Sequence, residues 1–174
     1  MKIRQTIILF ATFLVLVATV LLTQPPARAG ALTDHLENKL LDHLFRGQAY
    51  TAPGTLYVGL DTVACTEAGG GTEVSGGSYA RAAVPATLAA WAGSQGAGTT
   101  AASSGSAGTT SNNAAIVFPA PTANWGQILS FRLWDAASGG NALLCQALSV
   151  PKTVNNGDAA PQFNAGALTI QIDS

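Results

Sequence analysis

The chain has 174 residues, of which 48% are hydrophobic and only 10% are charged, and its formal net charge is −1. This length suits a single domain. The few Lys and Arg residues are not clustered, which excludes a nucleic-acid-binding surface, because such a surface needs gathered positive charge to neutralise phosphates. A body rich in Ala, Gly, Ser and Thr favours a packed structural protein that assembles over a strongly solvated enzyme.

The first 29 residues predict a secretory signal peptide. Lys2 and Arg4 form a positively charged start, an apolar run extends from Thr6 to Leu22, and Ala27-Arg28-Ala29 is a small-x-small cleavage site. Cleavage after Ala31 is one alternative. An uncleaved membrane anchor is another, because the run is at the lower limit of the roughly 17–25 residues that span a bilayer. We expect a protein secreted or held at the cell surface, which meets the membrane only through this segment before cleavage.

Cleavage near Ala29 leaves about one domain, within which we distinguish two parts. Residues 30–54 form an N-terminal arm that contains one helix, and residues 55–174 form a β domain with a low-complexity loop at 92–113. The loop is uncharged and rich in Gly, Ser and Thr, so it cannot bury enough apolar area to offset its chain entropy. We expect it to be exposed or ordered by a partner.

Residues 32–46 predict the helix, because leucines recur at helical spacing and make an apolar stripe. Asp34 and Glu37 are spaced like a capping box, and Gly47 is placed to end the helix. A short amphipathic helix near a new N-terminus must cover something, either its own domain or a neighbouring subunit. The side chains that we expect to make this contact are Leu36, Leu40, Leu44 and Phe45.

After Gly54 the pattern changes to short stretches rich in β-branched and aromatic residues, separated by clusters of Gly, Pro, Asn and Asp. The expected strands are 55–61, 78–88, 114–118, 127–135, 141–150 and 166–174. The fourth and fifth read as a β-hairpin with a loop of about five residues. Strands without interleaved helices predict a mainly β fold, an antiparallel sandwich or jelly roll with one short N-terminal helix.

Cys65 and Cys145 both lie in the body of the chain. In an oxidising compartment two thiols are expected to be bonded if the geometry allows it. Two buried free thiols that behave as small hydrophobes are the alternative.

Residue patterns for catalysis or metal binding are almost absent. His35 and His43 lie eight residues apart on the predicted helix, which is not the spacing that places two imidazoles on one metal. No Gly-x-Ser-x-Gly elbow supplies a nucleophile. Four acidic residues near loops could bind calcium weakly, but their spacing does not match a calcium loop: Asp61, Glu67, Glu73 and Asp135. We expect no enzyme activity, no metal and no cofactor.

The aromatic residues offer one route to a ligand, because stacked rings can hold a sugar. Such residues are more often core or interface anchors. The candidates are Trp91, Trp125, Trp134, Tyr50, Tyr57 and Tyr79.

Nearly all of the body resembles a family of phage structural proteins, usually described as tail-fibre or virion proteins. The first half carries a Leu-Phe-Arg-Gly turn, a LYVGL strand at 56–60 and GGTEVSGGSYAR at 70–81. The second half carries FPAPTANWG at 118–126, WDAASGGN at 134–141 and VPKTVNNGD at 150–158. The resemblance implies a β module that assembles with copies of itself or with other structural subunits.

The leader departs from this family, since virion proteins assemble in the cytoplasm and need no export signal. Our first hypothesis is therefore a non-enzymatic secreted protein that assembles into an extracellular filament, with its arm docked head to tail on the next subunit. A second is a genuine virion fibre or decoration protein, whose leader is an anchor or a misread start. A third is a secreted module that binds surface glycans or a receptor.

Overall fold

The computed structural model describes residues 31–104 and 106–172, so the predicted signal peptide at 1–29 lies outside the described residues. The elements in chain order are β1 (Ala31–Leu32), α2 (Asp34–Phe45), β2 (Thr55–Val63), β3 (Thr72–Glu73), β4 (Ala82–Pro85), β5 (Thr109–Ser111), β6 (Ile116–Val117), β7 (Gly126–Trp134), β8 (Ala142–Val154), β9 (Gln162–Phe163) and β10 (Thr169–Gln171). The predicted mainly β fold with one short helix is confirmed.

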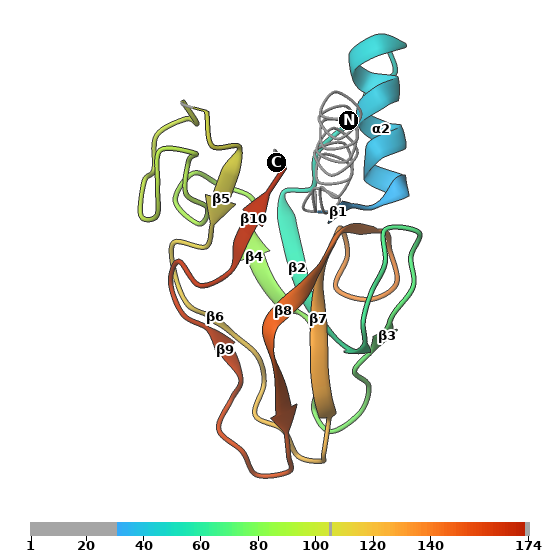
Figure 1. Ribbon diagram of the computed structural model, residues 1–174, viewed down its shortest axis with the longest axis vertical. Helices are drawn as coiled ribbons and strands as arrows, with labels where there is room; N and C mark the ends of the chain where they lie inside the picture. The colour runs from blue at the N-terminus through green and yellow to red at the C-terminus, as the bar shows by residue number, and fades with distance from the viewer. Residues whose placement is uncertain (1–30, 105, 173–174) are drawn as a thin grey trace, which may run out of the picture.

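The larger layer is an antiparallel sheet in the order β1-β8-β7-β2-β3, with β4 also paired to β2 (Figure 1). Its centre is the β7–β8 hairpin, in which Leu133 lies opposite Leu144 and Arg132 lies opposite Cys145. The predicted hairpin is thus confirmed. Because strand side chains alternate between the two faces, Leu133 and Leu144 face the core while Arg132 and Cys145 face away from it.

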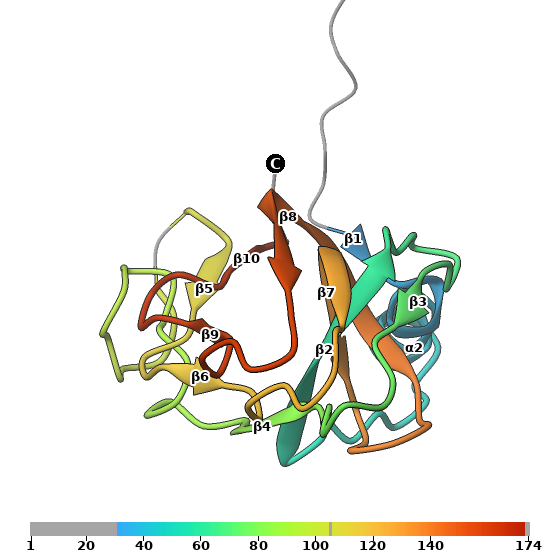
Figure 2. The same cartoon turned by 90° about the horizontal axis from the view of Figure 1, so that it is seen from below.

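The second layer consists of two small antiparallel pairs, β5 with β10 and β6 with β9. Figure 2 shows these pairs on the opposite side of the core from β2, β7 and β8. The buried apolar side chains between the layers include Val58, Ile128 and Phe131 from the large sheet, and Phe118 and Leu168 from the other side. The sandwich arises because each layer buries one apolar face against the other.

Several predicted segments differ from the structure in extent. The strands expected at 114–118 and 166–174 are shorter among the described residues, at Ile116–Val117 and Thr169–Gln171. Of the strand expected at 78–88, only Ala82–Pro85 forms, since Ser78 adopts a left-handed conformation (φ 63°) in a turn before it. The stretch at 92–113, expected to be exposed or ordered by a partner, is exposed over much of its centre but buried at both ends, where Ala92 donates its N–H to Ser111. The end of that stretch forms β5, which pairs with β10, and this pairing accounts for the burial.

The helix begins and ends close to the predicted residues. Its N-cap is Thr33, whose side chain accepts the N–H of Leu36, so the cap lies one residue before the expected Asp34. Asp34 and Glu37 occupy the first turn, where negative charge is favourable. Gly47 follows the last turn at φ 68°, a conformation that glycine adopts without steric cost, and thereby ends the helix.

Candidate assembly surfaces

Among the described residues, hydrogen bonds join the helix to the β body at its N-terminal end. β1 pairs with the outer edge of β8, where Ala31 lies opposite Cys145. Thr33 is buried, donates its N–H to Leu143 (3.1 Å) and its hydroxyl to Ala142 (2.5 Å), and Asp34 donates its N–H to Glu67 (3.2 Å). These bonds hold the N-terminal end of α2, and from there the helix extends away from the sheet (Figure 1).

The remainder of α2 is uncovered, and no residue in the helix is buried. Leu41 is 53% exposed, Leu44 68% and Phe45 79%. Of the four predicted contact residues, Leu44 and Phe45 are therefore exposed, whereas Leu36 and Leu40 are half-buried. The apolar stripe therefore divides along its length into a half-buried N-terminal part and an exposed C-terminal part. Leu41 belongs to the exposed part although it was not among the expected anchors.

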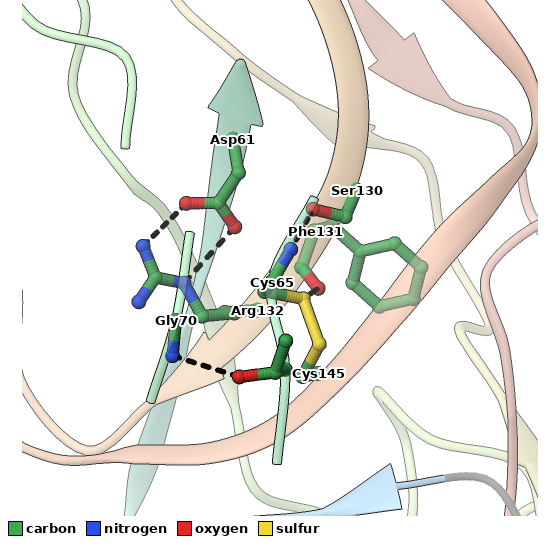
Figure 3. The surroundings of a disulfide bond; sticks show 8 residues. Asp61, Cys65, Gly70, Ser130, Phe131, Arg132 and Cys145 are labelled. Carbon is green, nitrogen blue, oxygen red and sulfur yellow. Dashed lines mark hydrogen bonds and ion pairs between the residues drawn. A yellow bond between two sulfur atoms is a disulfide. The ribbon is translucent and has the colours of Figure 1, made fainter. Parts of the chain in front are cut away.

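A disulfide fixes the segment that supports the base of the helix. Cys65 and Cys145 are bonded, with their Cα atoms 5.8 Å apart, and Cys65 donates its N–H to the hydroxyl of Ser130 (2.9 Å). Figure 3 shows this bond between the segment before β3 and strand β8, beside the Asp61–Arg132 ion pair. The bridge thus ties the segment that carries Glu67 to the strand on which β1 rests.

The outward face of the large sheet carries two ion pairs. Asp61 is fully buried and receives two hydrogen bonds from the Arg132 guanidinium, one of them at 2.9 Å. Arg81 likewise donates two bonds to Glu73, at 2.7 and 2.8 Å. A bidentate arrangement satisfies both oxygens of each carboxylate, which is the condition for burying such charges without large cost.

Trp134 lies against both arginines, with the guanidinium carbons of Arg81 and Arg132 at 3.7 and 4.5 Å from the ring centroid. Gly59 lies beside the ring, and a larger residue there would displace its neighbours, since a Cβ would lie 2.8 Å from Glu73 Oε1 and 2.9 Å from Trp134 Nε1. Burial acts to raise the pKa of Glu73, but hydrogen bonds from Arg81 and Tyr79 outweigh it and hold that pKa below its usual value. In this network both carboxylates are paired with arginines that also lie against the Trp134 ring.

Three of the four acidic residues that could bind calcium are engaged by other side chains or backbone groups. Asp61 and Glu73 bind arginines, and Asp135 accepts the backbone and side-chain N–H groups of Asn141 at 2.7 and 2.9 Å. Within residues 31–104 and 106–172, no three His, Cys, Asp or Glu side chains gather so as to hold a metal ion. Among the same residues, no helix is long and apolar enough to cross a membrane.

The aromatic residues do not form one stacking platform. Trp125 is buried in the core, donates its ring N–H to Gly77 (2.9 Å) and meets Tyr79 edge-on at 5.3 Å. Trp91 packs against the core, and Trp134 is covered by the arginines. Trp91 and Trp125 thus act as core anchors, which is the alternative role expected for these rings, and glycan binding stays a prediction.

A groove lined by both polar and apolar residues lies between β8 and the loop that carries β9. These two segments lie at the end of the molecule away from α2 (Figure 1). Phe118, Phe131 and Phe163 meet edge-on at its floor, with centroid distances of 6.2 and 5.5 Å. Leu148 lines it half-buried, and Val150 is 75% exposed at its rim.

A large irregularity in the pairing of β8 with β7 lies at the groove. Ser130 pairs with Ala147 and Ile128 pairs with Lys152, so a single residue of β7 lies opposite the four residues 148–151 of β8. The surplus residues leave the ladder, and Pro151 among them has no N–H to donate to it. The core side chains Phe118, Ile128 and Phe131 nevertheless remain buried behind this part of the strand. The groove was not predicted from the sequence, although Pro151 within an apolar strand is a signal of irregular pairing.

The described residues form an antiparallel β sandwich that carries an uncovered helix. The model of one protein family, described as "Gp80: Podophage GP4 fiber I protein gp80", matches residues 31–171. The chain belongs to this family of phage fibre proteins, which confirms the resemblance noted from its motifs. A search of curated proteins finds no match.

Proposed function

We propose that this phage-fibre-type protein is a non-enzymatic subunit that is exported and assembles with copies of itself into an extracellular filament. The observation that carries the proposal is the uncovered C-terminal half of α2. A helix fixed at its base that exposes Leu41, Leu44 and Phe45 leaves apolar area in water that a neighbouring subunit would cover. Every functional contact in this proposal is one of packing and requires no reactive group.

Three observations support export. The family match begins at Ala31, directly after the leader, so the leader precedes the matched body instead of forming part of it. Cleavage after Ala29 leaves both residues of β1 in place, whereas cleavage after Ala31 would remove the partner of Cys145. The Cys65–Cys145 disulfide suits an oxidising compartment.

The test of assembly uses paired substitutions on α2. Leu44→Glu together with Phe45→Glu places two charges on the exposed stripe, and Asn38→Glu adds a charge to an exposed polar position of the same helix as the control. We expect filaments, seen by electron microscopy, from the unaltered protein and the control but not from the double variant. Filaments from the double variant in normal yield would remove the helix from the assembly surface.

Export is tested separately by mass spectrometry of material sheared from producing cells. The proposal requires a chain that starts at Gly30. The family match also favours a second candidate, a true virion fibre protein whose leader is an anchor or a misread start. That candidate requires the protein to be present in phage particles, with residues 1–29 retained or never translated.

A further inference from the structure

The described part of the N-terminal arm is hydrogen-bonded to the β body near its two ends. At one end β1 pairs with β8, and the adjoining Thr33 and Asp34 donate hydrogen bonds to the body. At the other end Gly54 accepts the N–H of Ala86 (3.0 Å). Between these ends, no described residue of the arm forms a hydrogen bond with a described residue of the body. The first attachment can therefore open while the second stays in place.

The segment that follows the helix has the properties of a hinge. Residues 46–54 contain no helix or strand, and Thr51 and Ala52 are exposed. Thr51, Ala52 and Pro53 form no hydrogen bond with another described residue. This bond-free stretch is only three residues long, and a short hinge favours exchange of the element that it carries between copies of a chain.

We infer that β1 and the N-terminal end of α2 dock on β8 of a second copy of this chain, so that each arm crosses to a neighbouring subunit. The surface that receives them, here called the arm socket, consists of β8 at residues 142–145 and the carbonyl of Glu67. This inference rests on the proposed self-assembly and specifies the contact that joins the subunits. A subunit that gives its arm to one neighbour and receives the arm of another makes a heterologous contact, which propagates into a filament unless its rotation closes a ring.

The arm socket fits residues 31–34 closely. Thr33 is 3% exposed, with its N–H 3.1 Å from the carbonyl of Leu143, and Leu32 packs against the core. An arm from a second copy would make the same contacts, so exchange loses none of them. The disulfide from Cys65 to Cys145 joins β8 to the segment that carries Glu67, and it therefore holds the two sides of the socket together when the arm leaves.

Exchange also accounts for the exposed end of the helix. The helix has twelve residues and is therefore about 18 Å long. A rotation at residues 51–53 moves its N-terminal end from one body to the next, while its C-terminal end stays tied to its own body. The helix then spans the junction, and Leu41, Leu44 and Phe45, which are exposed in the single chain, lie between two bodies where their apolar area can be covered.

Disulfide trapping tests the exchange with the mature protein. Asp34 and Glu67 line the same small pocket at the base of α2, and the Asp34 N–H lies 3.2 Å from the Glu67 carbonyl. We expect unlabelled Asp34→Cys protein and isotopically labelled Glu67→Cys protein, mixed before assembly and then mildly oxidised, to become linked through the two introduced thiols. Mass spectrometry should find this link as the main product between chains. Asn38→Cys, at an exposed position further along the helix, replaces Asp34→Cys in the control and should lose this product.

The double variant Asp34→Cys/Glu67→Cys gives the opposite arms of the test. With exchange, its introduced disulfide joins neighbouring chains into a covalent ladder on a non-reducing gel. Filaments whose introduced disulfide lies within single chains would overturn the exchange and leave self-assembly intact, and so would links from position 34 to α2 of another copy. Absence of any association in the unaltered protein would reject both the exchange and the proposed assembly.

A substitution in the arm provides a second measurement. Thr33→Arg cannot enter the buried position of Thr33, but it leaves the arm socket of the same chain open. Added in small proportion to unaltered protein, this variant should end growing filaments and shorten them, as seen by electron microscopy. Thr33→Ser keeps the hydroxyl that caps the helix and bonds to Ala142, so it should leave the filament length unchanged. Filaments of normal length in the presence of Thr33→Arg would contradict docking in the socket.

Discussion

The β body and the helix of this protein are held in opposite ways. In the body, a disulfide, two bidentate ion pairs and a continuous apolar core all act on the same sheet. The helix is attached at Thr33 and Asp34 and contains no buried residue. Stability is therefore concentrated in the body, and the helix retains surface for a partner. Substitutions should separate the two, since changes in the body should alter unfolding and changes in the helix should alter association.

The disulfide gives the largest expected effect. It closes a separation of 80 residues, for which the chain-entropy relation predicts about 4–5 kcal/mol of stabilisation. The double variant Cys65→Ala/Cys145→Ala should lose about this free energy of unfolding, measured by denaturant titration. Unaltered protein kept under a reductant is the matched comparison. A loss below about 1 kcal/mol would mean that the segment 64–71 is held mainly by its hydrogen bonds.

The Asp61–Arg132 pair gives the next effect. Arg132→Leu leaves the fully buried Asp61 without its partner, and loss of one member of a buried ion pair typically costs about 3–5 kcal/mol. Replacing both members, with Asp61→Leu and Arg132→Leu together, should cost less because no charge remains unpaired. A double variant less stable than the single one would show that Asp61 and Arg132 stabilise the fold more through the packing of their side chains than through their charges.

The Glu73–Arg81 pair gives a smaller and pH-dependent effect. Glu73→Gln should cost about 2 kcal/mol at pH 7, in the range of hydrogen bonds to charged groups. Because the pKa of Glu73 is lowered in the folded protein, its contribution is complete above the unfolded value near 4.3 and is lost as the pH falls through the folded value. The stability difference between the variant and the unaltered protein should thus narrow below about pH 4. A constant difference from pH 7 to pH 3 would contradict this assignment.

The sequence predicted the parts of this fold whose signals are local. The leucine spacing at 32–46 and the alternating pattern of the β7–β8 hairpin each depend on residues close in the chain. The short strands β5 and β9 gave no such signal, because their pairing is decided by partners far away in the sequence. For the same reason the uncharged stretch at 92–113 seemed to be a free loop, although its end pairs with β10.

The candidate surfaces were predicted less completely than the fold. The stripe on the helix was visible as a pattern, but which part of it is exposed depends on where β1 and Thr33 attach the helix. The sequence also left open whether Cys65 and Cys145 are bonded, since distance in the fold decides it. The groove depends on a four-residue bulge opposite a single residue, which only the register between β7 and β8 reveals.

Substitutions at the exposed end of α2 should have the smallest effect on the free energy of unfolding. They should nevertheless weaken the association of subunits, and this contrast is the informative result. Leu44 and Phe45 are mostly exposed, and surface substitutions outside special features usually change stability by less than about 0.5 kcal/mol. Leu44→Glu and Phe45→Glu should each leave the free energy of unfolding of the dilute monomer within that range. Leu36→Glu is the comparison on the half-buried part of the same stripe, and it should destabilise the monomer measurably. If Leu44→Glu or Phe45→Glu destabilised the monomer as much as Leu36→Glu, the end of α2 would cover its own domain in solution, and the separation of a stable body from a helix kept free for a partner would not hold.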